Sequence, residues 1–533
     1  MRRSRWLLSF AACCFACVEG QAELPLPKLP PPGAVHSPLP YRSVSFYGAR
    51  ADKQLIRRAV AMGFNGVTFQ TDAGTISAVS DFAQRDRAEG YTDLAHALGM
   101  NVTLWVHELT EITPEMGPVS AANDALWTAI RDRYERVLGQ IAPQIDGLVL
   151  TVTESQIWVT DPDTLNKLVE VVRDRCRAHG KSLIVRTFVW TPDQLRQVMT
   201  AVQSMPLDVI IMSKYVPQDW NLRSVDDPAI GATAPHEQIA EYDAAGEYFL
   251  TDKVANAMPG HLKSHFDYDL AHGIRGVNVR VDRGSASVLY EPSEVNLWAL
   301  GALASGAVDS LDEIWNAWAR DRYGAASAAA VIASLEHSTD VVQEALYVQR
   351  LSFGDTRSFP PPNGDSDAFA NNWDVWKWDP FFIPMYQAAL NGDPSFIAAV
   401  DAAKQRALAL ASQSLEAARI AATTLSANEA AILRQRIANN QLELAVRAPM
   451  MRGYLRYRRI LVASDAGERA RLASEIRGEL AALRDLAGRS YPPFVSLDYL
   501  GRTWRVGGPD GIDWALVRGW ADRMEALLAT AAE

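Results

Sequence analysis

Residues 147–189 read GLVLTVTESQIWVTDPDTLNKLVEVVRDRCRAHGKSLIVRTFV, and this stretch decides the fold. Two runs rich in Val, Ile and Leu, Gly147–Thr153 and Ser182–Val189, enclose Asp163–Ala178, whose apolar residues recur at helical spacing. Continuous apolar runs are typical of parallel strands that are covered on both faces. The stretch therefore predicts a strand, a helix and a second strand parallel to the first.

The same alternation continues in both directions along the chain. Six further strands are expected at Ser43–Tyr47, Gly66–Gln70, Asn101–His107, Asp208–Lys214, Gln238–Tyr242 and Gly276–Val281. Helical patterns lie between several of them, for example at Asp124–Ile141 and at Pro192–Val202, where Pro192 fits a first helical position. Eight strands with intervening helices over residues 41–325 predict an α/β fold, a (β/α)8 TIM barrel. A doubly wound open sheet is the alternative, but FYGAR at 46–50 is not the glycine-rich phosphate turn typical of that fold.

Beyond residue 325 the pattern changes to helices. The segments rich in Ala, Leu, Glu and Arg at helical spacing are Ala325–Gln349, Asp401–Ser426, Asn428–Ser464 and Gly467–Leu486. We therefore expect an all-α domain over residues 326–533, with an aromatic-rich loop at 352–384 inside it. Leu/Ala stripes along these helices fit either packing on the barrel or a homodimer.

The first forty residues have the pattern of an exported protein. Residues 1–22 predict a signal peptide, with a basic start, an apolar stretch from Trp6 to Val18 and a small-residue exit ending at Ala22. The Pro-dense residues 23–40 predict an extended linker. We therefore expect a periplasmic or secreted location. A lipoprotein cleaved before Cys13 or Cys17 is the alternative, with poor residues three places upstream of either cysteine.

The composition excludes several other classes of protein. The 533 residues are 48% hydrophobic with a formal net charge of −11, which indicates a globular chain and argues against a nucleic-acid partner. Beyond the signal peptide no apolar run approaches the ~20 residues of a membrane span. After removal of that peptide Cys176 is the only cysteine left, so no disulfide is expected within the chain. We expect no cofactor and no metal. His261 and His265 stand four apart, but Leu262 occupies the position where a zinc protease carries Glu.

Polar residues at the carboxyl ends of barrel strands face the active site. Glu154 follows the fourth expected strand, Asp219 follows the sixth, and Glu241 lies in the seventh. Arg186, inside the fifth strand, must meet an anion, either a neighbouring carboxylate or that of a substrate. The remaining candidate substrate contacts are polar or aromatic residues near strand ends, namely Lys214, Trp105, His107, Trp190, Trp220, Tyr242, Asn278 and Asp282.

Carboxylates, cations and aromatic rings at one mouth indicate glycoside cleavage. Such a reaction needs one protonated acid for the leaving oxygen and one base or nucleophile opposite it. Aromatic faces stack on sugar rings, and basic residues pair with an acidic sugar. Each of the three candidate tryptophans also fits plain packing, and Glu154 and Arg186 also fit a rim ion pair.

Five stretches resemble motifs of the α-glucuronidases of glycoside hydrolase family 67, in the right order and on the expected strands. They are GFNGV at 63–67, DGLV at 146–149 leading to Glu154, RTFVW at 186–190, SKYVPQDW at 213–220 and QIAEY at 238–242. Two departures point to a distant relative. Leu150 stands where the family has a carboxylate-binding Lys, and the family's additional N-terminal α/β domain is not expected, because the barrel begins almost directly after the linker.

The resemblance implies a secreted enzyme that removes an α-linked glucuronic or 4-O-methylglucuronic acid from plant-type or bacterial oligosaccharides or polysaccharides, with inversion. It implies that Glu154 is the general acid, that Asp219 and Glu241 together activate the attacking water, and that Arg186 and Lys214 hold the uronate carboxylate. Three alternatives stay open: a retaining glycosidase that uses Glu154 and Glu241, a neutral-sugar glycosidase in which Arg186 only pairs a carboxylate, and a non-catalytic carbohydrate-binding envelope protein.

Overall fold

The protein is represented by a computed structural model. The residues that it describes are 26–47, 51–71, 76–107, 114–152, 159, 161–189, 191–214, 221–223, 226–247, 249–250, 253–283, 286–353, 359, 362, 382–491, 495–497, 503–505 and 512–531. The expected signal peptide and most of the aromatic-rich loop at 352–384 lie outside the described residues. Within the described part of the chain, no helix combines the length and the apolar character needed to cross a membrane.

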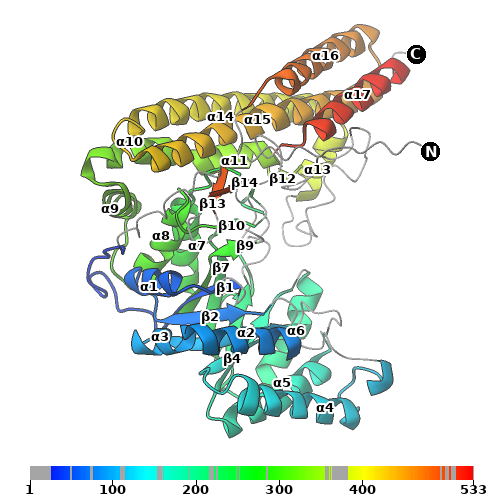
Figure 1. Cartoon of the computed structure of the whole chain (residues 1–533). Helices are drawn as coiled ribbons and strands as arrows, with labels where there is room; N and C mark the ends of the chain where they lie inside the picture. Colours follow the sequence, from blue (N-terminus) through cyan, green and yellow to red (C-terminus); the bar gives the residue numbers. More distant parts are fainter. Residues whose placement is uncertain are drawn as a thin grey trace, which may run out of the picture.

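Eight parallel strands form a closed barrel, drawn in blue to green in Figure 1. The strands are β1 (Tyr41–Tyr47), β2 (Gly66–Gln70), β3 (Asn101–His107), β4 (Gly147–Thr151), β5 (Ser182–Thr187), β6 (Ile210–Lys214), β7 (Gln238–Asp243) and β8 (Gly276–Arg280). Each strand pairs with the next in sequence, and β8 closes the barrel on β1, where Ser43 lies opposite Asn278. The eight expected strands and the predicted fold class are thereby confirmed.

Helices surround the barrel. They are α1 (Lys53–Ala61), α2 (Ile76–Glu89), α3 (Tyr91–Ala97), α4 (Asp124–Arg136), α5 (Pro162–Ala178), α6 (Pro192–Ser204), α7 (Pro259–Ala271) and α8 (Glu294–Ala304). Local sequence explains their starts. Asp161 caps α5, and Thr191 forms a reciprocal capping box with Gln194 at the start of α6, directly before Pro192.

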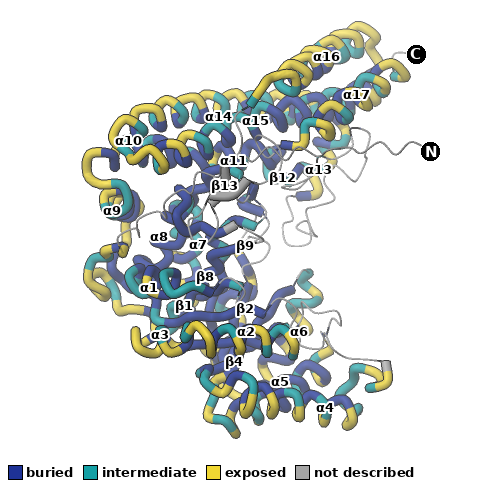
Figure 2. Tube along the Cα trace, in the orientation of Figure 1, coloured by how far each residue is buried: buried dark blue, intermediate teal, exposed yellow. Residues whose placement is uncertain are grey.

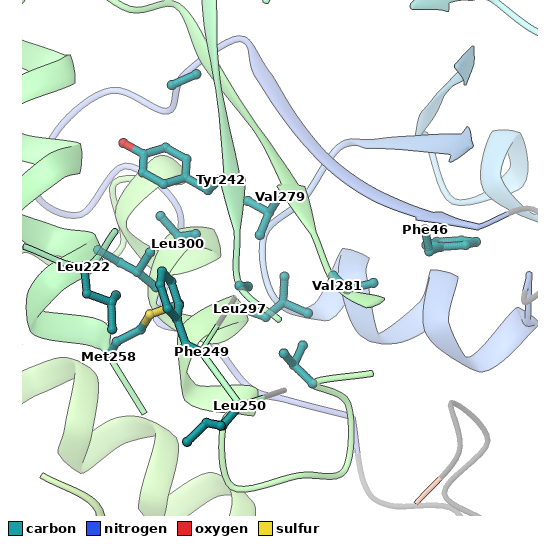
Figure 3. Close-up of a cluster of buried hydrophobic side chains, with 14 of the residues drawn as sticks. Phe46, Leu222, Tyr242, Phe249, Leu250, Met258, Val279, Val281, Leu297 and Leu300 are labelled. Carbon is teal, nitrogen blue, oxygen red and sulfur yellow. The ribbon is translucent and has the colours of Figure 1, made fainter. Parts of the chain in front are cut away.

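The strand residues alternate between two cores. Outward-facing side chains such as Val279 on β8 pack against the surrounding helices, and Figure 3 shows this residue with Leu297 and Leu300 of α8. Figure 2 shows the same division, with buried strands and helices that are exposed along their outer sides. Inside the barrel, a second apolar cluster consists of Trp105, Val149, Ile184, Ile210, Met212 and Ile239.

A helical region follows the barrel and lies above it in Figure 1. Its helices are α9 (Leu311–Tyr323), α10 (Ala325–Leu335), α11 (Ser338–Leu346), α13 (Phe382–Leu390), α14 (Pro394–Ala421), α15 (Ala427–Val462), α16 (Ala466–Gly488) and α17 (Trp514–Ala531). The helical character was expected. Besides its helices the region contains two short hairpins, which pair β11 (Tyr347–Val348) with β12 (Leu351–Ser352) and β13 (Val495–Leu497) with β14 (Thr503–Arg505).

The helical region contacts the loops that follow β7 and β8, on the side where the barrel strands end. The side-chain amide of Asn440 on α15 accepts from Ala255 N at 2.9 Å and donates to Ala255 O at 2.7 Å. Arg436 forms a two-point ion pair with Glu291, at 2.6 and 2.8 Å. Because these polar groups are buried and matched, they hold the helices in one orientation over this side of the barrel.

One buried cation ties the helical layer together. The ammonium of Lys404 on α14 is fully buried and donates to Glu344 Oε2 at 2.8 Å, to Glu344 O at 2.5 Å and to Tyr347 O. Burial lowers the pKa of Lys404 to about 8, although the charge of Glu344 opposes this shift.

The depressed pKa of Lys404 predicts a rise in stability with pH. Between about pH 8 and 10.5 the unfolded chain holds a proton at this lysine that the folded chain has released. The unfolding free energy of the wild type, minus that of Lys404→Met, should therefore rise by up to about 3 kcal/mol across this window. Denaturant titrations of both proteins at a series of pH values measure the difference, and a difference that stays flat with pH would contradict the prediction.

Candidate functional site

The upper half of the barrel interior, where the strands end, is charged. Alternate strands contribute to each layer of such a barrel. One layer contains Ser45 of β1, Trp105 of β3, Arg186 of β5 and Glu241 of β7. Arg186 donates from Nη2 to Glu241 Oε1 at 3.0 Å and from Nε to Oε2, and the two side chains are only 1% and 2% exposed.

This ion pair corresponds to one of the two expectations for Arg186. The residue was expected to meet either a neighbouring carboxylate or a substrate anion, and it meets Glu241. Two charge-assisted N–H···O bonds match the planar guanidinium to the carboxylate, which offsets part of the cost of burying both charges. Glu241 is therefore held in a fixed orientation inside the barrel.

Trp105 packs against the guanidinium. Its ring lies 4.6 Å from the Arg186 guanidinium carbon, and its indole N–H donates to Thr151 Oγ1 at 2.7 Å. Phe188 adds a second ring, 5.1 Å from the same carbon. Trp105 is only 1% exposed, so it offers no free face for a sugar. Its expected stacking role is replaced by a cation–π contact with Arg186.

A second layer, from the even-numbered strands, lies directly above. It contains Gln70, Thr151, Lys214 and Arg280. The Lys214 ammonium lies 4.3 Å from the centre of the Phe188 ring, and its backbone is in register with Glu241. Arg280 Nη2 donates to the Tyr47 hydroxyl at 3.0 Å, and its Nη1 lies 3.5 Å from Glu247. Burial lowers the pKa of Arg280, but the negative charges around it outweigh burial and raise it overall.

Two acidic residues at this mouth were missed from the sequence. Asp243 is the last residue of β7 and accepts from the backbone N–H groups of Ala245, Gly246 and Glu247, at 2.9, 3.1 and 2.6 Å. Burial raises the pKa of Asp243, and Arg280 opposes the shift. The sequence did contain a signal for Asp243. Side chains alternate between the two faces of a strand, so a residue two positions after Glu241 faces the same side as Glu241. Glu247 carried no such signal, because it lies beyond the strand.

Three further candidates lie at the same end of the barrel. His107 is half-buried, with its ring centre 6.2 Å from that of Trp105. Asp282 accepts from the backbone N–H of Tyr47, at 3.2 Å to Oδ2. Asn278 is buried and lies in register with Glu241, on the inner face of β8.

Tyr242 lies away from this site. It faces out of the barrel, is buried among apolar residues that include Val279 and Leu300 (Figure 3), and donates its hydroxyl hydrogen bond to Asp269 of α7. The expected substrate contact is therefore corrected to a packing role. The physical reason is the strand alternation, which turns Tyr242 outward wherever Glu241 points inward.

The positions of Glu154, Asp219, Trp190 and Trp220 lie outside the described residues. Glu154 follows the end of β4, and Asp219 follows the end of β6. The meeting of Glu154 and Asp219 with Glu241 therefore stays a prediction.

Among the described residues, no group of three or more His, Cys, Asp and Glu side chains could hold a metal ion. His261 and His265 lie with ring centres 4.4 Å apart on α7, and His265 Nδ1 is 2.9 Å from Asp226. Burial lowers the pKa of both histidines, that of His261 to about 3. Both are accounted for as packed neutral rings.

Comparison with known proteins shows the fold. No protein-family model and no curated protein sequence matches this chain. Among solved structures, the chain resembles a GH138 enzyme targeting the pectin rhamnogalacturonan II, with a TM-score of 0.65, 11% identity and coverage of 95% of this chain and 84% of that one. Two looser matches are a GH115 4-O-methyl-α-glucuronidase with specificity for decorated arabinogalactans (TM-score 0.46, 10% identity, 84% and 59% covered), and a Thermobaculum terrenum O-GlcNAc hydrolase mutant (TM-score 0.45, 10% identity, 93% and 94% covered).

The first match extends over nearly the whole chain, barrel and helical region together. The chain therefore shares the fold of that GH138 enzyme, and membership of family 67 stays a prediction.

The Arg186–Glu241 pair predicts a strong and coupled effect on stability. Arg186→Met and Glu241→Gln should each lower the unfolding free energy by about 3–5 kcal/mol, because each leaves one charge buried without its partner. The double variant should lose clearly less than the sum of the two. As a control, Arg196→Met breaks a pair whose side chains are 72% and 77% exposed, and it should change stability by less than about 0.5 kcal/mol. Additive losses in denaturant titrations would show that the pair is not coupled.

Proposed function

We propose that this protein is a glycoside hydrolase that removes an α-linked uronic acid, glucuronic or 4-O-methylglucuronic acid, from an oligosaccharide or polysaccharide. The observation that carries the proposal is the buried Arg186–Glu241 pair beneath a mouth that also holds Lys214 and Arg280. Charged side chains in a barrel core cost stability, so their concentration where the strands end points to a site that acts on a polar substrate. The shared fold with an enzyme that targets a pectin supports a polysaccharide substrate.

Glu241 is assigned the base role, together with Asp219, and Glu154 the role of general acid. A carboxylate that accepts two hydrogen bonds from one guanidinium suits an ionised group, which can orient and deprotonate water but has no proton to donate. The acid must then come from another strand, and Glu154, after the end of β4, is the candidate. This division of roles matches the two carboxyl groups that glycoside hydrolysis requires.

The ion pair changes the role that we assign to Arg186. Since its guanidinium is engaged by Glu241, Arg186 acts as a positioning residue for the base. Lys214 is the cation that we assign to the uronate carboxylate, because it lies one layer nearer the mouth and in register with Glu241.

A neutral-sugar glycosidase is the second candidate. One specific observation favours it: Arg186 pairs with a carboxylate of the protein, Glu241, which leaves less of its guanidinium for the carboxylate of a substrate. A retaining mechanism that uses Glu154 and Glu241 is the alternative to inversion within either candidate. We further propose export by the signal peptide to the periplasm or the medium; a homodimer through the helical region remains our proposal for assembly.

The proposed reaction predicts the product and its anomer. From α-linked glucuronides the wild type should release free uronic acid, seen first as the β anomer by proton NMR, because inversion delivers water to the opposite face. The α anomer first would establish retention. The Glu154→Gln variant serves as the control and should lose at least about 100-fold in kcat on an unactivated substrate. Release of no sugar from glucuronidated, galacturonidated and neutral oligosaccharides would overturn the proposal.

Substitution of Lys214 separates acidic from neutral substrates. Lys214→Met should lower kcat/KM about 10- to 100-fold on an α-glucuronide, because a charge-assisted hydrogen bond is lost. The same change should have less than about a threefold effect on the matching α-glucoside. A comparable loss on both substrates would favour the neutral-sugar candidate. Lys167→Met, at a partly exposed surface pair on α5, is the matched control and should leave both rates unchanged.

A further inference from the structure

The β8–β1–β2 side of the barrel interior contains hydrogen-bonding atoms that the protein does not match. Among the buried polar atoms of the described residues, five on these three strands have no hydrogen-bond partner in the protein: Ser45 Oγ, Gln70 Oε1, Asn278 Nδ2, Asn278 Oδ1 and Arg280 Nε. These four residues are 0%, 5%, 2% and 4% exposed, respectively. An unmatched buried polar atom costs free energy, so such a concentration on adjacent strands needs an explanation.

On the opposite side of the two charged layers, the polar side chains have partners within the protein. There Trp105 donates to Thr151, and Arg186 is engaged by Glu241. Among the described residues, other unmatched buried atoms lie on helices and loops, but those on the barrel strands are confined to β8, β1 and β2. They lie on one wall, and that wall adjoins the proposed base, because Asn278 is in register with Glu241 and Arg280 is in register with Asp243.

The five atoms include both donors and acceptors, which restricts the class of ligand that could match them. Two are amide oxygens that accept, two are N–H groups that donate, and one is a hydroxyl that does both. A carboxylate or phosphate only accepts, so it would leave the oxygens of Gln70 and Asn278 unmatched. A sugar hydroxyl donates one hydrogen bond and accepts others, so neighbouring hydroxyls of one ring match donors and acceptors together.

We propose that Ser45, Gln70, Asn278 and Arg280 form a subsite, the β8–β1–β2 subsite, that selects the sugar beside Glu241 by the configuration of its hydroxyl groups. Gln70 is its outermost amide, since it is the last residue of β2 and lies in register with Tyr47 and Trp105. The inference rests on the proposed function for its ligand class, a sugar ring, and it adds the residues that distinguish one sugar from another. A site built to hydrogen-bond a hydroxyl rejects an analogue that misplaces it, because its own buried groups are then left unpaired.

The test measures binding rather than turnover. Calorimetric titration gives the affinity of the wild type for D-glucuronic, D-galacturonic and D-mannuronic acid. Galacturonic acid differs from glucuronic acid only in configuration at C4, and mannuronic acid only at C2. We expect the wild type to prefer one of them by at least about tenfold. In Gln70→Leu this preference should fall below about threefold, and Ser45→Ala should reduce it in the same direction. A wild type without preference, or a preference that survives in both variants, would overturn the inference.

Thermal unfolding without sugar provides a second readout. Because the Gln70 oxygen has no partner in the protein, Gln70→Leu should not lower the unfolding midpoint. The matched control is Gln238→Leu, an amide on the outer face of β7 that is bonded to Ser213 and Ala229, both at 2.8 Å. It should lower the midpoint and retain the preference among the sugars. A Gln70→Leu variant that loses stability but keeps the preference would show a structural amide and overturn the subsite.

The two proposals fail separately. Hydrolysis of uronides with a sugar preference that does not depend on Gln70 would retain the proposed function and remove the subsite. If the protein binds sugars with a preference that depends on Gln70 but hydrolyses no uronide, the proposed subsite is supported and the proposed hydrolase activity is overturned.

Discussion

A guanidinium inside a closed barrel needs a carboxylate at hydrogen-bonding distance, and this constraint organises the upper half of the molecule. Arg186 and Glu241 come from strands that are not neighbours, so they meet only because the barrel is closed and alternate strands share a layer. The Trp105 ring lies 4.6 Å from the guanidinium carbon, in the same layer. The pair therefore fixes the orientation of Glu241 through two residues that both lie on barrel strands.

The lower and upper halves of the barrel interior differ in composition. Its lower interior is filled by Val149, Ile184, Met212 and other apolar residues, which stabilise the closed sheet. Its upper interior carries ion pairs and unmatched polar atoms, which add little net stability. The helical region anchors the loops after β7 and β8 through Asn440 and Arg436. The loops beside the proposed base are thereby held by a second packed unit.

Much of the fold followed from local pattern, and the errors at the site share one cause. Apolar runs bounded by helices located every strand, and the charge of Arg186 alone required an anion. Trp105 and Tyr242 were assigned to substrate because both lie near strand ends, yet one supports the guanidinium and the other faces α7. Asp243 was missed, although its distance of two residues from Glu241 placed it on the inner face. Residue type and proximity to a strand end do not specify direction, whereas alternation does.

The sequence by itself determined that eight strands would form, that Arg186 would need an anion, and that polar residues would gather where the strands end. These are properties of single segments and of single charges. Only the tertiary structure decided that the anion is Glu241 and that Gln70, Ser45 and Asn278 lie unmatched on one wall. The reason is that the layer in which a side chain lies depends on the register of all eight strands around the closed barrel, which no single segment encodes.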